Sequence, residues 1–273
     1  EIGVRLVGSE MCIRDRNEIM KELVQIRTES SMDFPINVKD LADYEIVQPL
    51  LSIQLCDPEK NQEYLKDKPH TACGELAAVY RIQVMENSEG TASAVITNNM
   101  LNSWGITLEQ LHDDTIRAEN TRSSVRFYSM EDVMAEIMFS AEPANLFEQS
   151  VSLETDAAPM YVLTNQSKIN GAGVLARDGV LEKIGELLGS DFYVLPSSTH
   201  EVILVPDNGN MQTKELEDMV KEVNATQVAP EDLLSDKVQY YDRAAKTLGR
   251  KQEKGLLELS LIHISEPTRR TPI

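Results

Sequence analysis

Two short apolar runs on either side of a polar turn restrict the fold of this chain more than any other feature. Residues 192–195 (FYVL) and 202–205 (VILV) flank the segment 196–201 (PSSTHE). β-Branched and aromatic residues favour a pleated, half-buried surface, whereas proline and small polar residues interrupt it. Residues 206–210 (PDNGN) then supply strong turn chemistry after the second run. The pattern predicts a β-hairpin over residues 191–207.

Strand patterns and helical patterns alternate along the rest of the chain. Further strands are expected over residues 46–55, 76–84, 92–97, 160–163 and 171–175. Helices are expected over residues 17–27, 59–66, 98–104, 108–120, 130–139, 180–188, 213–224 and 231–248. The strands over 76–84 and 92–97 are joined by a short turn and should form a second hairpin. Hairpins without strict β-α-β order predict an α+β fold with largely antiparallel sheets and helices packed on one face.

Three positions carry helix-end signals. Thr107 with Gln110 fits a capping box, and Ser129 resembles a weaker cap at the start of the next helix. Gly189 follows the apolar pattern of residues 180–188 and is typical of a C-terminal stop. In the helix expected over residues 130–139, apolar side chains recur at helical spacing, namely Val133, Met134, Ile137 and Met138.

Both ends of the chain look like translated sequencing adapter rather than natural protein. Residues 10–15 can be back-translated into the end sequence of a transposase-type library adapter, and residues 259–265 into its reverse complement. We therefore expect residues 1–16 and 259–273 to be adapter-derived artefacts, and both are set aside in reasoning about the fold. The remaining residues, 17–258, are expected to be a fragment that is truncated at its start.

A stretch in the middle of the chain has little apolar periodicity. Residues 141–158 contain Pro143 and several carboxylates, which is typical of a solvated connection. The sequence therefore predicts an N-terminal α+β half over residues 17–140, an acidic linker over 141–158 and a C-terminal α+β half over 159–250.

The charge of the chain bears on its partners. It has 45 acidic and 26 basic residues, a net charge of −19. A field of this sign repels phosphate groups, so neither nucleic acid nor a membrane surface is expected as a partner. Cys56 and Cys73, the cysteines of residues 17–258, are spaced for neither a zinc ribbon nor a disulfide scaffold. A soluble protein of the reducing cytoplasm is the expectation.

The predicted turn holds the densest group of reactive side chains, Ser197, Ser198, His200 and Glu201. A nucleophilic serine needs a base within hydrogen-bond reach and donors for the oxyanion. Ser198 and His200 are two residues apart across a turn, so their side chains could be neighbours, although no G-x-S-x-G elbow is present. In the alternative interpretation, the serine hydroxyls bond to the turn backbone while His200 and Glu201 help to close the hairpin.

Other kinds of site have weaker support. The histidines at 70, 112 and 200 form no H-x-x-x-H pattern and the cysteines no C-x-x-C pattern, so neither a metal nor a cofactor is expected. The loop over residues 165–173 (NQSKINGAG) lacks both phosphate-binding signatures, and a plain hairpin turn is the simpler interpretation. Its first residue, Asn165, is kept as a candidate for ligand binding.

Several segments together resemble the bacterial domain-of-unknown-function family 5688. The most specific are residues 195–198 with 200–202, residues 219–224 and residues 234–236. Further similar segments are residues 68–70, 76–84, 95–98, 104–106 and 160–165, so that the resemblance covers roughly residues 45–248. Residues 72–75 depart from the family pattern. The resemblance implies no established activity and no catalytic residues.

Two functional hypotheses follow. The first is an accessory domain that binds another protein or a small ligand without catalysis, with Ser197, Ser198, His200, Glu201 and Asn165 as candidate ligand-binding residues. The second is a hydrolase or transferase whose site centres on Ser198, His200 and Glu201. No catalytic residue is assigned under the first hypothesis.

Overall fold

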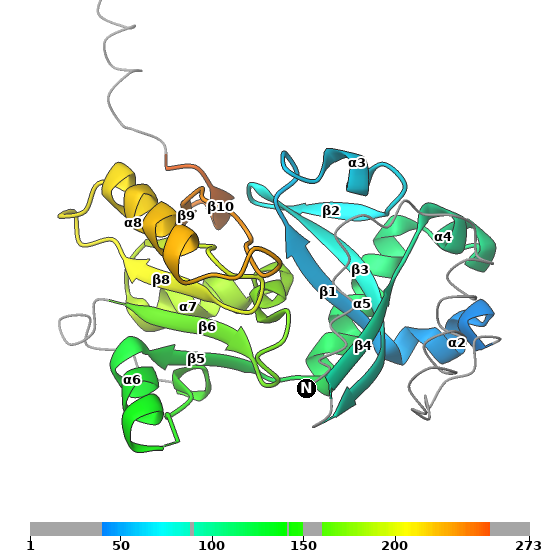
Figure 1. Cartoon of the computed structure of the whole chain (residues 1–273), viewed down its shortest axis with the longest axis horizontal. Coiled ribbons are helices and arrows are strands. Elements are labelled where there is room, and N and C mark those ends of the chain that lie inside the picture. Colours follow the sequence, from blue (N-terminus) through cyan, green and yellow to red (C-terminus); the bar gives the residue numbers. More distant parts are fainter. Residues whose placement is uncertain (1–39, 88–89, 141, 150–159, 252–273) are drawn as a thin grey trace, which may run out of the picture.

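The expected hairpin lies at the centre of a six-stranded antiparallel sheet (Figure 1). In the computed structural model, which describes residues 40–87, 90–140, 142–149 and 160–251, β7 (Phe192–Leu195) and β8 (Val202–Pro206) pair antiparallel with Phe192 opposite Pro206. The prediction for residues 191–207 is confirmed. In spatial order the sheet consists of β10 (Thr247–Gly249), β9 (Gln239–Asp242), β7, β8, β6 (Tyr161–Asn165) and β5 (Val125–Ser129).

A second antiparallel sheet has four strands, which are β1 (Leu51–Cys56), β2 (His70–Cys73), β3 (Leu76–Asn87) and β4 (Gly90–Val95). The long strand β3 lies in its middle and pairs with the other three. The predicted hairpin of residues 76–84 and 92–97 is therefore confirmed as β3 and β4. The strand expected over residues 46–55 begins only at Leu51, because the proline at 49 lies in a short 3-10 helix, η2 (Gln48–Leu50).

The helices connect and cover these sheets. They are α2 (Tyr44–Val47), α3 (Gln62–Leu65), α4 (Asn98–Trp104), α5 (Leu108–Arg122), α6 (Met130–Phe139), α7 (Val180–Leu188) and α8 (Thr213–Thr226), with 3-10 turns η1 (Asp40–Ala42), η3 (Leu146–Glu148) and η4 (Gly171–Ala176). The Thr107 hydroxyl accepts from the backbone N–H of Gln110 at 3.1 Å, as the capping signal predicts. The Ser129 hydroxyl caps α6 in the same way, and Gly189 ends α7 with a left-handed φ of 69°.

One hydrophobic core is shared by the two sheets, which lie side by side in Figure 1. It includes Ile82 of β3, Leu111 of α5, Ile184 of α7 and Val194 of β7. Side chains alternate across a strand, so Tyr193, the residue before Val194 in β7, points to the other face. There it packs against α8 in a second cluster. The α+β class with antiparallel sheets is confirmed, but helices cover both faces of the six-stranded sheet, α7 on one and α8 on the other, and not the single face that was expected.

Two predicted elements are wrong. The strand expected over residues 171–175 is the 3-10 turn η4, because its glycines bring backbone against backbone: a Cβ on Gly173 would lie 2.9 Å from the carbonyl oxygen of Ile53. Residues 231–248, where a helix was expected, form β9 and the start of β10 instead. Tyr241 of β9 stacks on Phe192 of β7 with ring centroids 5.0 Å apart, so pairing with a distant strand overrides the local helical spacing.

The sheet of the C-terminal half includes a strand from before residue 140, where the N-terminal half was expected to end. β5, at residues 125–129, pairs with β6 and so belongs to the sheet of the C-terminal half. Asn145, from the expected linker, closes the outer edge of β5: its side-chain oxygen accepts from Phe127 N at 2.9 Å and its amide donates to Val125 O at 3.0 Å. A blocked edge cannot template pairing with another strand.

Some expectations fall outside the described residues. These are the two adapter-like ends, the helix over residues 17–27, and residues 141 and 150–158 of the expected linker. In the part of the chain that the structure describes, no helix has the length and apolar character needed to cross a membrane.

Candidate functional site

The turn between β7 and β8 is held by a second stretch of backbone, residues 232–235. Ser197 O accepts from Leu234 N at 3.0 Å, and Thr199 N donates to Asp232 O at 2.8 Å. Ser198 and Leu233 form an isolated antiparallel bridge. This pairing fixes the direction in which the reactive side chains of the turn point.

His200 joins the turn to two other segments. Its Nδ1 accepts the backbone N–H of Asn170 at 3.2 Å, and its Nε2 lies 3.0 Å from Asp232 Oδ1. A ring nitrogen that accepts a backbone N–H carries no proton, so this network assigns the proton of the neutral ring to Nε2, which donates to the carboxylate. The His200 side chain is 29% exposed and that of Asp232 17%. Both ring nitrogens are therefore engaged in contacts that tie three segments together.

Neither serine of the turn forms a hydrogen bond with this ring. Ser198 Oγ accepts from the backbone N–H of His200 at 3.1 Å, a local turn contact rather than a bond to the imidazole. Ser197 is half-buried, and its carbonyl oxygen forms the backbone contact described above. Glu201 is exposed. The structure thus places these four residues in one turn without forming a serine–histidine pair.

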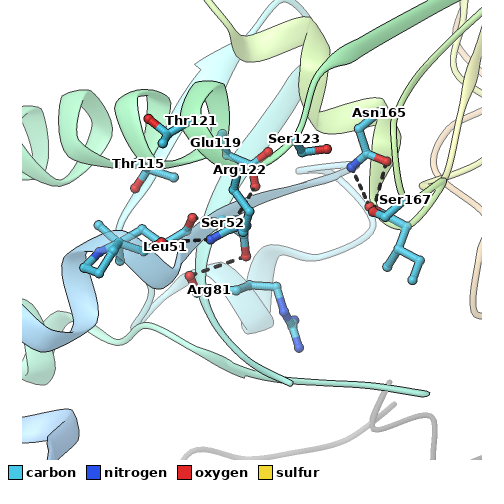
Figure 2. A network of polar contacts seen from close by, with 12 residues as sticks. Leu51, Ser52, Arg81, Thr115, Glu119, Thr121, Arg122, Ser123, Asn165 and Ser167 are labelled. Carbon is cyan, nitrogen blue, oxygen red and sulfur yellow. Dashed lines mark hydrogen bonds and ion pairs between the residues drawn. The ribbon is translucent and has the colours of Figure 1, made fainter. Parts of the chain in front are cut away.

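Asn165 is buried and is the last residue of β6, where the loop that meets the turn begins. Its amide donates to Ile169 O at 2.8 Å, and its side-chain oxygen accepts from Ser167 Oγ at 3.3 Å (Figure 2). The adjacent Thr164 hydroxyl donates to His200 O at 2.8 Å. Asn165 therefore shapes the loop that presents Asn170 to the His200 ring. The backbone of Gly171 is so close that an added Cβ would collide with Thr164 Oγ1 and His200 O.

A second junction lies beside the turn and involves the segments 219–224 and 234–236. The Asn224 amide donates to Ser235 O at 3.1 Å and to Asp236 Oδ1 at 2.7 Å. The hydrogen bond from Asn224 and that from the Lys60 ammonium lower the pKa of Asp236. Ser235 Oγ donates to the buried Asp57 at 3.1 Å, which connects this junction to the end of β1. The segments that carry the family resemblance most specifically therefore meet in one region of the fold.

A buried ionic network joins α5, β1 and the end of η4. Arg177, at the end of η4, donates to the carboxylate of Glu119 on α5 and to Ser123 O. Arg122 donates to the second oxygen of Glu119 at 3.1 Å and to Leu51 O at 2.8 Å (Figure 2). Burial lowers the pKa of Arg177, although the Glu119 carboxylate opposes that effect. Its side chain is only 2% exposed, so this charge depends on its partner.

The helix α6 presents a different kind of surface. None of its residues is buried. Its exposed apolar side chains, which we call the α6 patch, are Met134 (48% exposed), Ile137 (73%), Met138 (61%) and Phe139 (76%). The helix lies at the β5 edge of the six-stranded sheet (Figure 1). The sequence pattern located this apolar helix, but a periodic pattern is equally typical of a helix that packs on a core, so it did not identify the patch.

A metal site has no support in the described residues. In residues 40–251, as far as the structure describes them, no group of three or more histidine, cysteine or carboxylate side chains could hold a metal ion. The described cysteines, Cys56 and Cys73, are free thiols. Burial raises the pKa of each to about 12, with Asp57 adding to the effect at Cys56. A thiol with such a pKa is a weak nucleophile at neutral pH.

The sequence model of DUF5688, a family of unknown function, matches residues 10–243. The chain belongs to this family. The resemblance seen in the sequence is confirmed, and it covers more of the chain than the segments that revealed it. The match overlaps the adapter-like N-terminal end at residues 10–16, and the adapter origin of both ends stays a prediction. Comparison with curated proteins and with solved structures gives no match.

Proposed function

We propose that this member of DUF5688 is a non-catalytic accessory domain of the bacterial cytoplasm that binds another protein through the α6 patch. The observation that carries the proposal is the exposure of four large apolar side chains, between 48% and 76%, on a helix with no buried residue. Apolar residues scattered singly over a surface are ordinary, whereas a contiguous group marks a contact site. Fully burying such a side chain contributes about 1.5–3 kcal/mol relative to leaving it exposed. These side chains are already partly covered, so a partner that covers the patch gains a part of that free energy at each of them.

The contacts at the turn support a protein-binding role over a small-ligand site there. The ring of His200 and the amide of Asn165 already bond within the fold, and the Ser198 hydroxyl bonds to the turn backbone. A ligand at the turn would have to replace these contacts, and each replacement costs the hydrogen bond that is lost. The two free thiols fit a reducing compartment.

One observation favours the alternative function, a hydrolase or transferase. His200 and Asp232 form a half-buried imidazole–carboxylate pair, the arrangement that orients a general base. The ring, however, has no nitrogen left to take a proton from Ser198, because Nδ1 accepts from Asn170 and Nε2 faces the carboxylate. Turnover of ester, amide or phosphoester substrates that Ser198→Ala abolishes without loss of fold would establish the enzyme.

The protein-binding proposal is tested by comparing what three forms of the full chain retain from a lysate of the bacterium that encodes it. The first is the wild type, and the second is the α6 variant, Ile137→Ser with Met138→Ser and Phe139→Ser. The third is a matched control on α8, Met219→Ser with Val223→Ser, because these side chains are also exposed, at 39% and 36%. We expect a defined protein to bind the wild type and the α8 control but not the α6 variant. Identical captures by all three forms would refute the proposal.

A further inference from the structure

We propose that the α6 patch binds a basic amphipathic helix of its partner protein, an inference that rests on the proposed function and specifies the partner's chemistry. The surface is a short apolar stripe with acidic surroundings on an acidic protein. Three properties of the patch carry the inference: its shape, its charge and the blocked strand beside it.

The shape of the patch suits a helix. Met134, Ile137 and Met138 are spaced i, i+3 and i+4, so they form one stripe along α6. Phe139 is the last residue of the helix and lies about 100° further round it than Met138. Helices bind each other by laying such stripes together, with anchors at the same spacing on the partner. Two of the side chains are methionines, whose flexible thioethers adapt to different partner side chains. The stripe therefore provides hydrophobic anchoring without demanding one partner sequence.

The charges around the patch are mostly negative. Glu131 is exposed at the start of α6, and Glu142 is exposed just after its end. Glu136 lies between them and forms an ion pair with Lys168 at 3.1 Å. Burial raises the pKa of Tyr128, at the end of β5. Arg126 and Lys168 oppose that effect and Glu136 and Glu142 add to it, so both carboxylates lie on this side of the sheet together with those two cations. A basic partner would gain from this field and an acidic one would be repelled.

Charge also disfavours a second copy of this chain as the occupant. Each copy has a net charge of −19, and a symmetric contact would bring the carboxylates of two α6 helices together. An anionic membrane surface is disfavoured for the same reason. The partner that fits both the apolar stripe and its acidic surroundings is a helix with leucine-like residues on one face and lysine or arginine on the other.

The neighbouring strand excludes the other common way to bind a peptide, the addition of a strand to a sheet edge. The outer edge of β5 is occupied by the Asn145 side chain, which pairs with Phe127 N and Val125 O. An incoming strand would have to displace both hydrogen bonds. Packing against the exposed helix requires no such displacement.

The test uses three fluorescently labelled synthetic peptides with the full chain. One is an amphipathic Leu/Lys peptide, one has the same pattern with Leu and Glu, and one is a scrambled Leu/Lys peptide that cannot form an apolar face. We expect fluorescence anisotropy to show that the amphipathic Leu/Lys peptide binds at least about tenfold more tightly than the others. A tenfold difference in affinity corresponds to about 1.4 kcal/mol of binding free energy. The α6 variant should weaken its binding by about tenfold or more, and the α8 control should leave it unchanged.

A second comparison isolates the charge. The double variant Glu131→Gln with Glu142→Gln keeps the apolar stripe, so it should weaken binding several-fold at low salt. The difference from the wild type should shrink in about 0.5 M salt, where screening is strong. Equal binding of the Leu/Glu peptide, or Leu/Lys binding that the α6 variant does not reduce, would overturn the inference. An α6-dependent dimer in sedimentation velocity would also overturn it, in favour of a second copy.

The failure of this inference is distinguishable from the failure of the proposed function. If no basic peptide binds but the lysate comparison still reveals a protein lost only in the α6 variant, the partner chemistry is wrong and the protein-binding function stands. If neither experiment depends on the α6 patch, both are wrong.

Discussion

Replacing His200 by alanine separates a structural turn from a catalytic one. In the structure the ring donates to the Asp232 carboxylate at 3.0 Å and accepts from Asn170 N at 3.2 Å. A hydrogen bond to a charged group contributes about 1.5–3 kcal/mol, and one between neutral groups about 0.5–1.5 kcal/mol. Because the side chains of His200 and Asp232 are 29% and 17% exposed, water will partly replace the lost contacts. We therefore expect His200→Ala to lower the free energy of unfolding by about 2–3 kcal/mol.

The assay is thermal and urea unfolding followed by circular dichroism. For a chain of this size, a loss of about 2–3 kcal/mol corresponds to a fall in Tm of roughly 4–12 °C. Ser198→Ala removes only one neutral contact, to His200 N, so it should cost about 0.5–1.5 kcal/mol. The control is His70→Ala, because this histidine is exposed and loses only the contact of Nδ1 with Lys68 O at 2.9 Å, so it should cost no more than about 0.5–1.5 kcal/mol.

A His200→Ala variant as stable as the wild type would refute this reasoning. It would mean that the ring does not hold the three segments together, and the enzymatic alternative would then account better for its place in the turn. Hydrolase or transferase activity that disappears in a fully folded His200→Ala protein would likewise favour the enzymatic alternative.

Three further perturbations test other parts of the structure. Glu119→Gln leaves Arg177 buried without its counter-charge and should cost about 3–5 kcal/mol in urea unfolding; a cost near zero would contradict the buried network. Gly171→Ala should cost about 3 kcal/mol or more because its Cβ meets backbone, whereas Gly249→Ala, with open space at its Cβ, should be neutral. The amide of Asn224 and the ammonium of Lys60 lower the pKa of Asp236 in the folded state. The stabilisation that this carboxylate gives the fold is therefore complete above the usual carboxyl pKa of about 4, and it is lost as the pH falls through the lower folded value. Between pH 6 and 3 the Tm of Asp236→Asn should therefore fall less than that of the wild type, and parallel curves would contradict the assignment.

Much of the local structure follows from the sequence alone. The central hairpin, the β3–β4 hairpin and the caps at Thr107, Ser129 and Gly189 depend on residues close together in the chain. Turn propensity, alternation and capping are short-range effects, so a short window contains all the groups that decide them. The family could also be recognised from such short segments.

The candidate site was only partly predictable for the same reason. The sequence placed Ser198 and His200 in one turn, and the structure confirms that placement. The partner of the ring, Asp232, comes from 32 residues further along the chain. No local pattern reports which distant carboxylate a histidine will meet, or that the neighbouring hydroxyl will bond to the backbone instead.

Tertiary packing decided the elements that local patterns misassigned. Residues 239–242 have helical spacing around them, yet they become β9 because β7 offers an unpaired edge and Phe192 offers a stacking partner for Tyr241. Residues 171–176 look like a strand but turn, because their glycines fit against Ile53 and the His200 carbonyl. The exposure of α6 was decided in the same way: its apolar face is visible in the sequence, but whether the rest of the chain covers that face depends on where β5 and β6 place the helix. Burial is a property of the assembled fold, because the groups that exclude water from a side chain come from anywhere in the chain.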